Sequence, residues 1–214
     1  MTDESALDPV SAAVVRSGIV AILRAKTADG FAAVADVLVE AGITALEVTL
    51  TSRGAIDAIA GLRRQLPGTV AVGAGTVLTA DDAKASVGAG AEFLVSPVID
   101  PGLIAAASVP FYPGTLTPTE IYAAIQAGAP LVKLFPASGL GPRYLRDIRG
   151  PLPTARIMPT GGVKIEDIAD WLMAGAVAVG LGSPLIGDAA AGGNLKALAE
   201  RARHAVSAVA IARS

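Results

Sequence analysis

A lysine inside a short apolar run is the residue of this chain best placed to do covalent chemistry. Lys133 lies in the middle of the run 131–135, which has a proline-containing turn on either side. A run this short between turns predicts a buried strand, on which Leu131, Lys133 and Phe135 share one face. Burial disfavours the charged ammonium, and the uncharged amine is the form that attacks a ketone. The alternative is a lysine paired with a buried carboxylate that only holds the core together.

Two more charged residues lie in or directly after apolar runs and could share a site with Lys133. Arg24 follows the first run, and Glu47 lies in the second run, on the face opposite the apolar Leu46 and Val48. An arginine binds a carboxylate through two parallel hydrogen bonds, and a glutamate can transfer protons. We therefore predict that Arg24 holds a substrate carboxylate while Glu47 moves protons. A structural ion pair between the two is the alternative.

Glycine-rich turns follow the last two apolar runs and indicate a phosphate site. Gly161 and Gly162 come after the seventh run, and Gly182 and Ser183 come after the eighth. Glycine lets an anion approach backbone N–H groups closely, and the last two loops of an α/β barrel often bind phosphate in this way. Ordinary tight turns are the alternative. Thr76, in the glycine-rich segment after the third run, either orients a substrate oxygen or satisfies its own loop.

The elements that must position these residues alternate regularly along the chain. Apolar runs separated by amphipathic segments of helical period lie at 18–23, 45–50, 70–72, 93–95, 110–112, 131–135, 156–158 and 177–179. This alternation predicts βα units around a parallel sheet, which is an α/β fold. Four helix-like segments end in a dipeptide that suits a helix C-terminus, because glycine tolerates a left-handed backbone. These dipeptides are Ala41-Gly42, Ala89-Gly90, Ala127-Gly128 and Ala174-Gly175.

The dipeptides precede every second run, and this regularity favours a single (β/α)8 TIM barrel with extra N-terminal and C-terminal helices. An open doubly wound sheet is the alternative. We expect one domain over 1–214, with the barrel at about 18–186, a short helix at 11–17 and a C-terminal helix at about 194–213. Side chains at the ends of barrel strands gather in one mouth, so Arg24, Glu47 and Lys133 should converge there.

The composition limits the possible partners. Hydrophobic residues make up 52% of the 214 residues, and the net charge of −2 comes without a basic tail or stripe. Neither nucleic acid nor a membrane surface is therefore an expected partner. The chain has no cysteine and a single histidine, His204, which excludes a thiolate or histidine-rich metal centre. An acidic start without an apolar signal core predicts a cytoplasmic protein.

Four ordered motifs point to a known family. They are LEVTL at 46–50, GAGTVL at 73–78, KLFP at 133–136 and PTGGV at 159–163. Together they resemble the class I 2-keto-3-deoxy-6-phosphogluconate (KDPG) aldolases, a family that includes 4-hydroxy-2-oxoglutarate (KHG) and 2-dehydro-3-deoxy-6-phosphogalactonate aldolases. The resemblance covers about 18–186. It implies a lyase of the Entner–Doudoroff type that uses a Schiff base, needs no metal or other cofactor, and forms a homotrimer.

The resemblance also implies a role for each matching residue. Lys133 resembles the family's Schiff-base lysine, and Glu47 resembles its general acid/base. Thr76, Pro97, Phe135 and Thr160 resemble residues of the family's pyruvate pocket. Gly161, Gly162 and Ser183 resemble its phosphate site, to which the glycine turn adds Gly182. Some members place an arginine four residues after the glutamate, where this chain has Thr51. Arg24, which other members share, is therefore the expected ligand of the substrate carboxylate.

The implied reaction is cleavage of 2-keto-3-deoxy-6-phosphogluconate to pyruvate and glyceraldehyde 3-phosphate. The phosphogalactonate epimer and 4-hydroxy-2-oxoglutarate stay open as substrates, because no residue pattern fixes the C4 configuration or the need for phosphate. Two other classes also stay open. A phosphate-binding barrel isomerase or epimerase would need the glycine turns without the lysine, and a non-catalytic barrel could serve as an assembly subunit.

Overall fold

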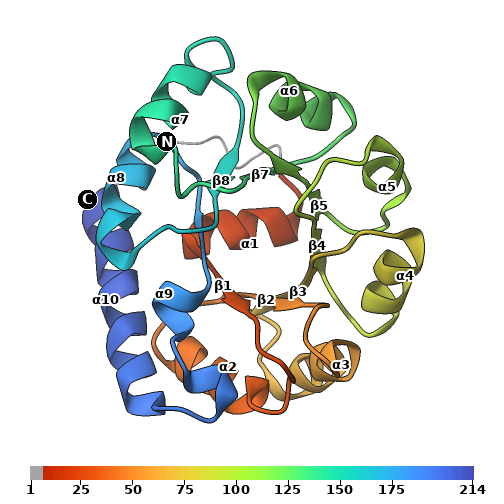
Figure 1. Ribbon diagram of the computed structural model, residues 1–214, viewed down its shortest axis with the longest axis vertical. Helices are drawn as coiled ribbons and strands as arrows, with labels where there is room; N and C mark the ends of the chain where they lie inside the picture. Colours follow the sequence, from red (N-terminus) through yellow and green to blue (C-terminus); the bar gives the residue numbers. More distant parts are fainter. Residues whose placement is uncertain (1–6) are drawn as a thin grey trace.

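In the computed structural model, which describes residues 7–214, parallel strands lie inside and helices surround them (Figure 1). The strands are β1 (Ile19–Leu23), β2 (Ala45–Thr49), β3 (Ala71–Gly75), β4 (Phe93–Val95), β5 (Phe111–Tyr112), β6 (Gly114–Thr115), β7 (Val132–Leu134), β8 (Ile157–Pro159) and β9 (Val179–Leu181). The predicted α/β alternation is confirmed.

The helices follow the strands in sequence and are mostly short. They are α1 (Pro9–Ser17), α2 (Phe31–Glu40), α3 (Ala55–Gln65), α4 (Ala80–Gly88), α5 (Pro101–Ala106), α6 (Pro118–Gln126), α7 (Gly141–Arg149), α8 (Ile168–Met173), α9 (Ser183–Ile186) and α10 (Leu195–Arg213). Two short 3-10 helices, η1 (Ile165–Asp167) and η2 (Ala189–Ala191), lie before α8 and before α10.

The strands form two parallel sheets, so the predicted eight-stranded barrel is seen only in part. The larger sheet has the order β5-β4-β3-β2-β1-β9, and the smaller one has the order β6-β7-β8. The last strand therefore pairs with the first, which differs from the strand orders of doubly wound sheets. The larger sheet curls back on itself, and the smaller sheet lies across the interior from its central strands (Figure 1).

Two junctions bring the sheets together. Pro113 is the single residue between β5 and β6, and the predicted run ended at residue 112, so β6 was not predicted. Proline has no N–H to donate to a ladder, although its carbonyl still accepts a hydrogen bond from the Lys133 N–H at 2.9 Å. At the other side, Thr160 forms an isolated parallel bridge with Gly180.

Strand β3 is longer than its apolar run indicates. The prediction ended it at residue 72 and treated the following glycines as a loop, but the strand continues through Gly75. Glycine usually weakens a strand, yet a Cβ on Gly73 would overlap the ring of Phe93 on the neighbouring strand. The glycine is therefore needed for close packing inside the sheet. Strand β9 likewise begins two residues later than predicted.

Helix ends follow the local signals in the sequence. Ala41, Ala89, Ala127 and Ala174 are C-caps, and the glycines after them have φ values of 101°, 99°, 97° and 101°. This confirms the predicted glycine C-terminus at each Ala-Gly dipeptide. Side chains accept hydrogen bonds from the first N–H groups of α1, α4, α5, α6 and α10, and these N-caps are Asp8, Thr79, Asp100, Thr117 and Asn194.

An apolar cluster fills the N-terminal end of the strands, and α1 lies across it (Figure 1). Val14 and Val15 of α1 pack against inward residues from strands of both sheets and from the residues just before them: Val20, Ala45, Ala71, Phe93, Val95, Tyr112, Leu131, Met158, Val177 and Ala178. The buried hydroxyls of Ser11 and Tyr112 form a hydrogen bond of 2.9 Å. This end of the molecule is thus closed, which leaves the C-terminal ends of the strands for a site.

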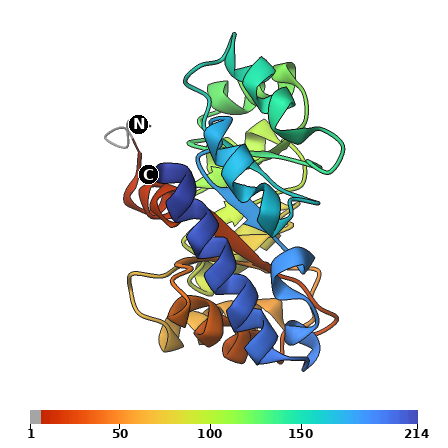
Figure 2. The same ribbon diagram turned by 90° about the vertical axis from the view of Figure 1, so that its left-hand side faces the viewer.

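The C-terminal helix α10 packs outside the strands against α8 and α2 (Figure 2). Its extent confirms the predicted terminal helix. Leu198, Ala202, Ala205 and Val209 form its buried face. Neither α10 nor any other helix within residues 7–214 combines the length and apolar character that crossing a bilayer requires.

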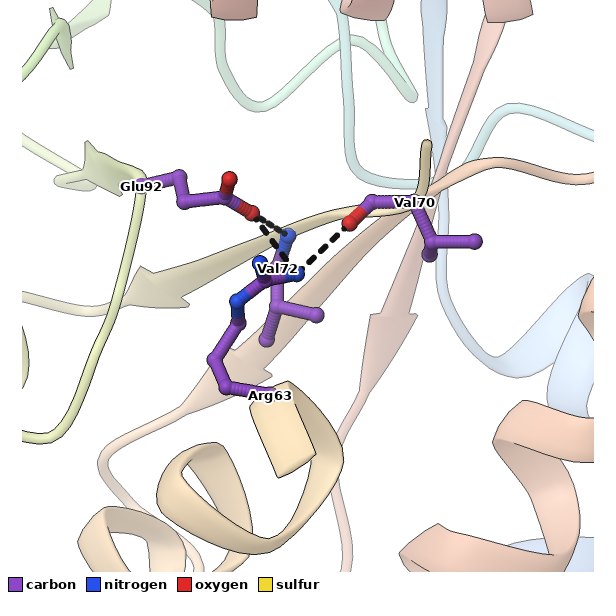
Figure 3. Close-up of polar contacts among 4 residues, drawn as sticks. All are labelled: Arg63, Val70, Val72 and Glu92. Carbon is purple, nitrogen blue, oxygen red and sulfur yellow. Dashed lines mark hydrogen bonds and ion pairs between the residues drawn. The ribbon is translucent and has the colours of Figure 1, made fainter. Parts of the chain in front are cut away.

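An ion pair between Arg63 and Glu92 holds the backbone at the start of β3 (Figure 3). Arg63 Nη1 lies 3.0 Å from Glu92 Oε2 and donates to the Val70 carbonyl at 2.9 Å. The same Glu92 oxygen accepts the Val72 N–H at 3.0 Å, and the Glu92 N–H donates to the Val72 carbonyl at 2.8 Å. Glu92 therefore binds both backbone groups of one β3 residue.

Candidate active site

Lys133 points into the space enclosed by the strands. It is 4% exposed, and its neighbours Val132 and Leu134 belong to the outer core between strands and helices, whereas Leu131 belongs to the inner cluster. The predicted alternation of faces is confirmed. Its Nζ lies 5.0 Å from the centroid of the Phe135 ring. Nζ has no ion pair or hydrogen bond with other residues in the range 7–214, so the alternative of a lysine paired with a buried carboxylate is wrong.

Glu47 is a buried carboxylate without a partner. The residue is 0% exposed, and neither Oε1 nor Oε2 accepts a hydrogen bond from any part of the chain that the structure describes. Leaving such a group unpaired is unfavourable, and native structures rarely keep one without a functional reason. The side chain occupies space above Gly75 on the neighbouring strand, where a Cβ would overlap Oε1. The carboxylate is therefore available to react with a bound molecule.

Arg24 directly follows β1 and contacts the loop that follows β3. Its Nη2 donates to Thr76 Oγ1 at 3.4 Å, and it forms no ion pair with Glu47. The structural ion pair considered from the sequence is therefore not present. Thr76 has a φ of 62°, which is unusual for a β-branched residue, and strained backbone of this kind concentrates at functional sites. Its hydroxyl binds the Arg24 side chain instead of its own loop.

Phe135 and Thr160 line the same part of the interior as Lys133. The Phe135 ring lies beside Lys133 and against Gly161, where a Cβ would come within 2.9 Å of Cε2. Thr160 is 3% exposed and its hydroxyl donates to the Met158 carbonyl at 3.3 Å. The Phe135 ring thus lies beside the amine, whereas the place of Thr160 in the pocket stays a prediction.

Pro97 reaches this region from the loop after β4. A Cβ on Gly114 would overlap the Pro97 carbonyl group, so the absence of a side chain on Gly114 lets the loop approach. Gly114 is the register partner of Lys133 on the neighbouring strand. Pro97 therefore contacts β6, the strand beside the one that carries the lysine, and its place in a pyruvate pocket stays a prediction.

The two glycine turns begin side by side, because the residues just before them form the bridge between β8 and β9. Gly161 and Gly162 have φ values of 85° and 80°, which only glycine adopts readily. Gly182 precedes the short helix α9, and Ser183 is its exposed first residue. No hydrogen bond within residues 7–214 joins the Ser183 hydroxyl to the other predicted site residues, so its role stays a prediction.

Several residues of this region had no role in the sequence prediction. Gly75 and Gly114 provide space for Glu47 and for Pro97. A glycine within a strand can mark such a close approach, but the sequence does not say which group approaches. Thr49 and Ser52 are buried hydroxyls that bind the backbone on either side of Arg24. No sequence signal identifies them, because their partners lie 26 and 27 positions away.

Two cavities lie away from this region. One of about 590 Å³ lies at the opposite end of the strands, between α1 and the end of α10, and one of about 260 Å³ lies between α4 and α5. Neither is lined by a predicted site residue. We therefore locate the candidate active site by its chemical groups, since a buried amine and an unpartnered carboxylate are groups that catalysis uses.

Comparisons with known proteins agree with this arrangement. Residues 10–199 match the model of the family described as KDPG and KHG aldolase. A protein of Rhizobium meliloti named probable 2-dehydro-3-deoxy-6-phosphogalactonate aldolase is 37% identical over 171 residues, 78% of this chain and 81% of that protein. The 2-dehydro-3-deoxy-phosphogluconate aldolase of Haemophilus influenzae is 35% identical over 158 residues, 72% of this chain and 74% of that protein.

A solved structure shows the same similarity in three dimensions. It is the KDPG aldolase from Legionella pneumophila, with pyruvate captured at low pH as a covalent carbinolamine intermediate. Its TM-score to this chain is 0.83 at 28% identity, and the superposition covers 92% of this chain and 97% of that one.

Proposed function

This chain belongs to the KDPG and KHG aldolase family, and we propose that it cleaves 2-keto-3-deoxy-6-phosphogluconate to pyruvate and glyceraldehyde 3-phosphate through a Schiff base. The observation that carries the proposal is that an amine and a carboxylate are both buried on the inner side of the strands. Lys133 is 4% exposed with its Nζ 5.0 Å from the centroid of the Phe135 ring, and Glu47 is 0% exposed without a partner for its carboxylate in the described chain. A fully buried carboxylate without a partner is unfavourable in a core that only holds the fold together.

Lys133 supplies the covalent step. Its uncharged amine adds to the C2 ketone to give a carbinolamine, Glu47 relays a proton to the C2 hydroxyl, and that hydroxyl leaves as water to give an iminium ion bonded to the lysine. The iminium accepts the electron pair of the C3–C4 bond when that bond breaks. The products of this step are an enamine of pyruvate on Lys133 and free glyceraldehyde 3-phosphate.

Glu47 moves the protons. Its carboxylate takes the proton of the C4 hydroxyl, directly or through one water, as the C3–C4 bond breaks. The same group returns the proton to C3 of the enamine, which restores the iminium. Hydrolysis of the iminium then releases pyruvate and the free amine of Lys133. A carboxylate without hydrogen bonds in the protein suits this exchange, because no competing partner must be displaced.

Binding of the two anionic ends of the substrate would be divided between two parts of the mouth. Arg24, whose guanidinium contacts Thr76 Oγ1 at 3.4 Å, would hold the carboxylate. Pro97, Phe135 and Thr160 would line the pyruvate end of the pocket. Gly161, Gly162, Gly182 and Ser183 would bind the phosphate through backbone N–H groups, which the adjacent start of the two turns supports.

We also propose that the two sheets act as one closed (β/α)8 barrel in a single domain over 1–214. Three observations support closure: one residue separates β5 from β6, a bridge joins the end of β8 to β9, and one inner cluster draws residues from both sheets. Assembly of this chain into a homotrimer stays a prediction.

Trapping with borohydride tests the proposed function. Pyruvate plus borohydride should inactivate the enzyme and add one reduced pyruvate to the peptide that contains Lys133, as read by mass spectrometry. Lys133→Met should abolish both cleavage and trapping. Lys84→Met, which changes an exposed lysine of α4, is the matched control and should behave as the parent. Trapping at another lysine, or activity that resists borohydride as an isomerase or epimerase would, overturns the proposal.

The choice of substrate needs a separate measurement, because the relatives carry both names. Cleavage rates for the gluconate-derived and galactonate-derived epimers, and for 4-hydroxy-2-oxoglutarate, should be compared in one assay. We expect the gluconate-derived phosphate ester to give the highest kcat/KM. A preference for the galactonate epimer would reassign the substrate and leave the Schiff-base chemistry in place.

A further inference from the structure

We propose that Thr49 and Ser52 are positioning residues that hold Arg24 in the orientation needed to bind a substrate carboxylate. The proposal rests on the proposed function, because it assumes a keto acid bound at Lys133. It adds two hydroxyl groups that would act through Arg24 without touching the substrate.

Both hydroxyls bind the backbone that flanks Arg24. Thr49 Oγ1 donates to the carbonyl of Leu23 at 3.1 Å, and Ser52 Oγ accepts the N–H of Ala25 at 3.1 Å. The two hydroxyl oxygens are themselves 3.4 Å apart. The peptide groups before and after Arg24 are therefore both fixed by the same pair of side chains.

These hydrogen bonds lie where the strand ladder stops. The last register pair between β1 and β2 joins Leu23 to Val48, and the chains meet again only at the bridge between Thr27 and Arg53. Arg24 lies in the short stretch between these two points. Side-chain hydroxyls there replace the ladder hydrogen bonds that would otherwise hold the backbone.

Burial makes these hydrogen bonds effective. Thr49 is 0% exposed and Ser52 is 2% exposed, so water does not compete for either hydroxyl. The contact from Arg24 to Thr76 is long, at 3.4 Å, and exposed, so it constrains the guanidinium only weakly. The backbone of Arg24 is thus held by buried hydroxyls, while its guanidinium is able to bind a ligand. Such preorganisation lowers the entropy that binding must remove.

The test compares two ligands with the same ketone, of which only one has a carboxylate. Pyruvate has a carboxylate for Arg24, whereas its methyl ester has the same ketone for Lys133 but no carboxylate. For each ligand, borohydride inactivation gives a half-saturating concentration and a maximal rate. Thr49→Val should raise the half-saturating pyruvate concentration about tenfold, the factor that one ordinary hydrogen bond contributes. The maximal rate, and both values for the ester, should stay within about twofold of the parent.

Three further variants distinguish a loss of Arg24 positioning from a general loss of folding or activity. Thr49→Ser keeps the hydroxyl and should restore the parent values. Ser52→Ala should give the same ligand-specific change, and it keeps the proposal testable if Thr49→Val does not fold. Thr27→Val removes a hydroxyl that bonds to Asp29 in the same loop and should change nothing.

A double variant shows whether the hydroxyls act through Arg24. In an Arg24→Met background, Thr49→Val should have no further effect on pyruvate. An additive effect, or an equal loss for pyruvate and its ester, overturns the positioning role. If the parent traps pyruvate at Lys133 but Arg24→Met binds it normally, this inference fails and the proposed function stands. If the parent does not trap pyruvate at Lys133, the proposed function itself fails.

Discussion

Gly75 and Glu47 lie on neighbouring strands, and the missing side chain of Gly75 leaves the space that the Glu47 carboxylate occupies. The carboxylate has no hydrogen-bond partner in the described chain, so nothing except the shape of this space sets its position. A glycine in a strand interior normally weakens the strand. Here the conformational cost is offset by room for a proposed catalytic group.

The first prediction follows directly from this contact. Gly75→Ala should displace the Glu47 side chain and lower kcat at least about 100-fold, as expected for a reacting group misplaced by about 1 Å. Gly61→Ala, at an open position within α3, is the matched control and should raise the free energy of unfolding by about 0.5–1 kcal/mol without changing activity. Steady-state kinetics and chemical denaturation measure both. Full activity of Gly75→Ala would contradict the geometry.

A second prediction concerns the unpartnered carboxylate of Glu47. Glu47→Gln should lower kcat by about 10²–10⁴, the range for lost acid–base catalysis, with KM changed far less. Because the buried carboxylate lacks hydrogen bonds, the variant should unfold at the same denaturant concentration as the parent or a higher one. Glu40→Gln, on the exposed end of α2, is the control. An unchanged kcat would remove Glu47 from the mechanism.

Thr76 gives a third prediction, in which stability and affinity change in opposite directions. Its φ of 62° is unfavourable for a β-branched residue, and glycine relieves this strain. Thr76→Gly should therefore raise the free energy of unfolding by about 1 kcal/mol. The same change removes the hydroxyl that binds Arg24 and should raise KM. A loss of stability in denaturant unfolding would show that the hydroxyl contributes more than the strain costs.

The fourth prediction concerns alkaline pH and Tyr112. Burial raises the pKa of the Tyr112 phenol well above its usual range, although its hydrogen bond to Ser11 acts in the opposite direction and Asp8 adds a smaller rise. A raised folded-state pKa means that this group's stabilisation is complete below pH about 10 and declines above it, as the unfolded phenol ionises.

The free energy of unfolding should therefore fall as the pH rises above about 10. Tyr112→Phe should show a shallower fall, although it should cost about 1 kcal/mol at neutral pH because the hydrogen bond to Ser11 is lost. Denaturant titrations at a series of pH values measure both. Equal alkaline slopes for the two proteins would exclude Tyr112 as the titrating group.

The fifth prediction concerns the ion pair between Arg63 and Glu92 (Figure 3). Glu92→Ala removes the acceptor for both Arg63 and the Val72 N–H, and it should lower the free energy of unfolding by about 1–3 kcal/mol. Arg143→Ala, which breaks a solvated pair with Asp147 within α7, should change it by less than about 0.5 kcal/mol. Equal losses for the two variants would show that the backbone contact adds nothing.

Local signals in the sequence determined much of the fold. Apolar runs predicted most strands to within a few residues, and the Ala-Gly dipeptides predicted four helix C-termini. Strand alternation also predicted that Lys133 faces the interior. These features depend on neighbours close in sequence, so a local pattern is sufficient to predict them. Strand β6 after Pro113 and the extension of β3 through Gly75 were missed, because both form only through pairing and packing with the adjacent strand.

For the candidate site, too, the sequence predicted some features and only the tertiary structure showed the others. Residue type and position after a strand singled out Lys133, Glu47 and Arg24, since few side chains of this chemistry occur in apolar runs. Only the tertiary structure decided that Arg24 contacts Thr76 instead of Glu47, that Gly75 makes room for the carboxylate, and that Thr49 holds the backbone beside Arg24. The physical reason is register: contacts between residues some 25–50 positions apart form only when curled sheets bring particular strand ends together.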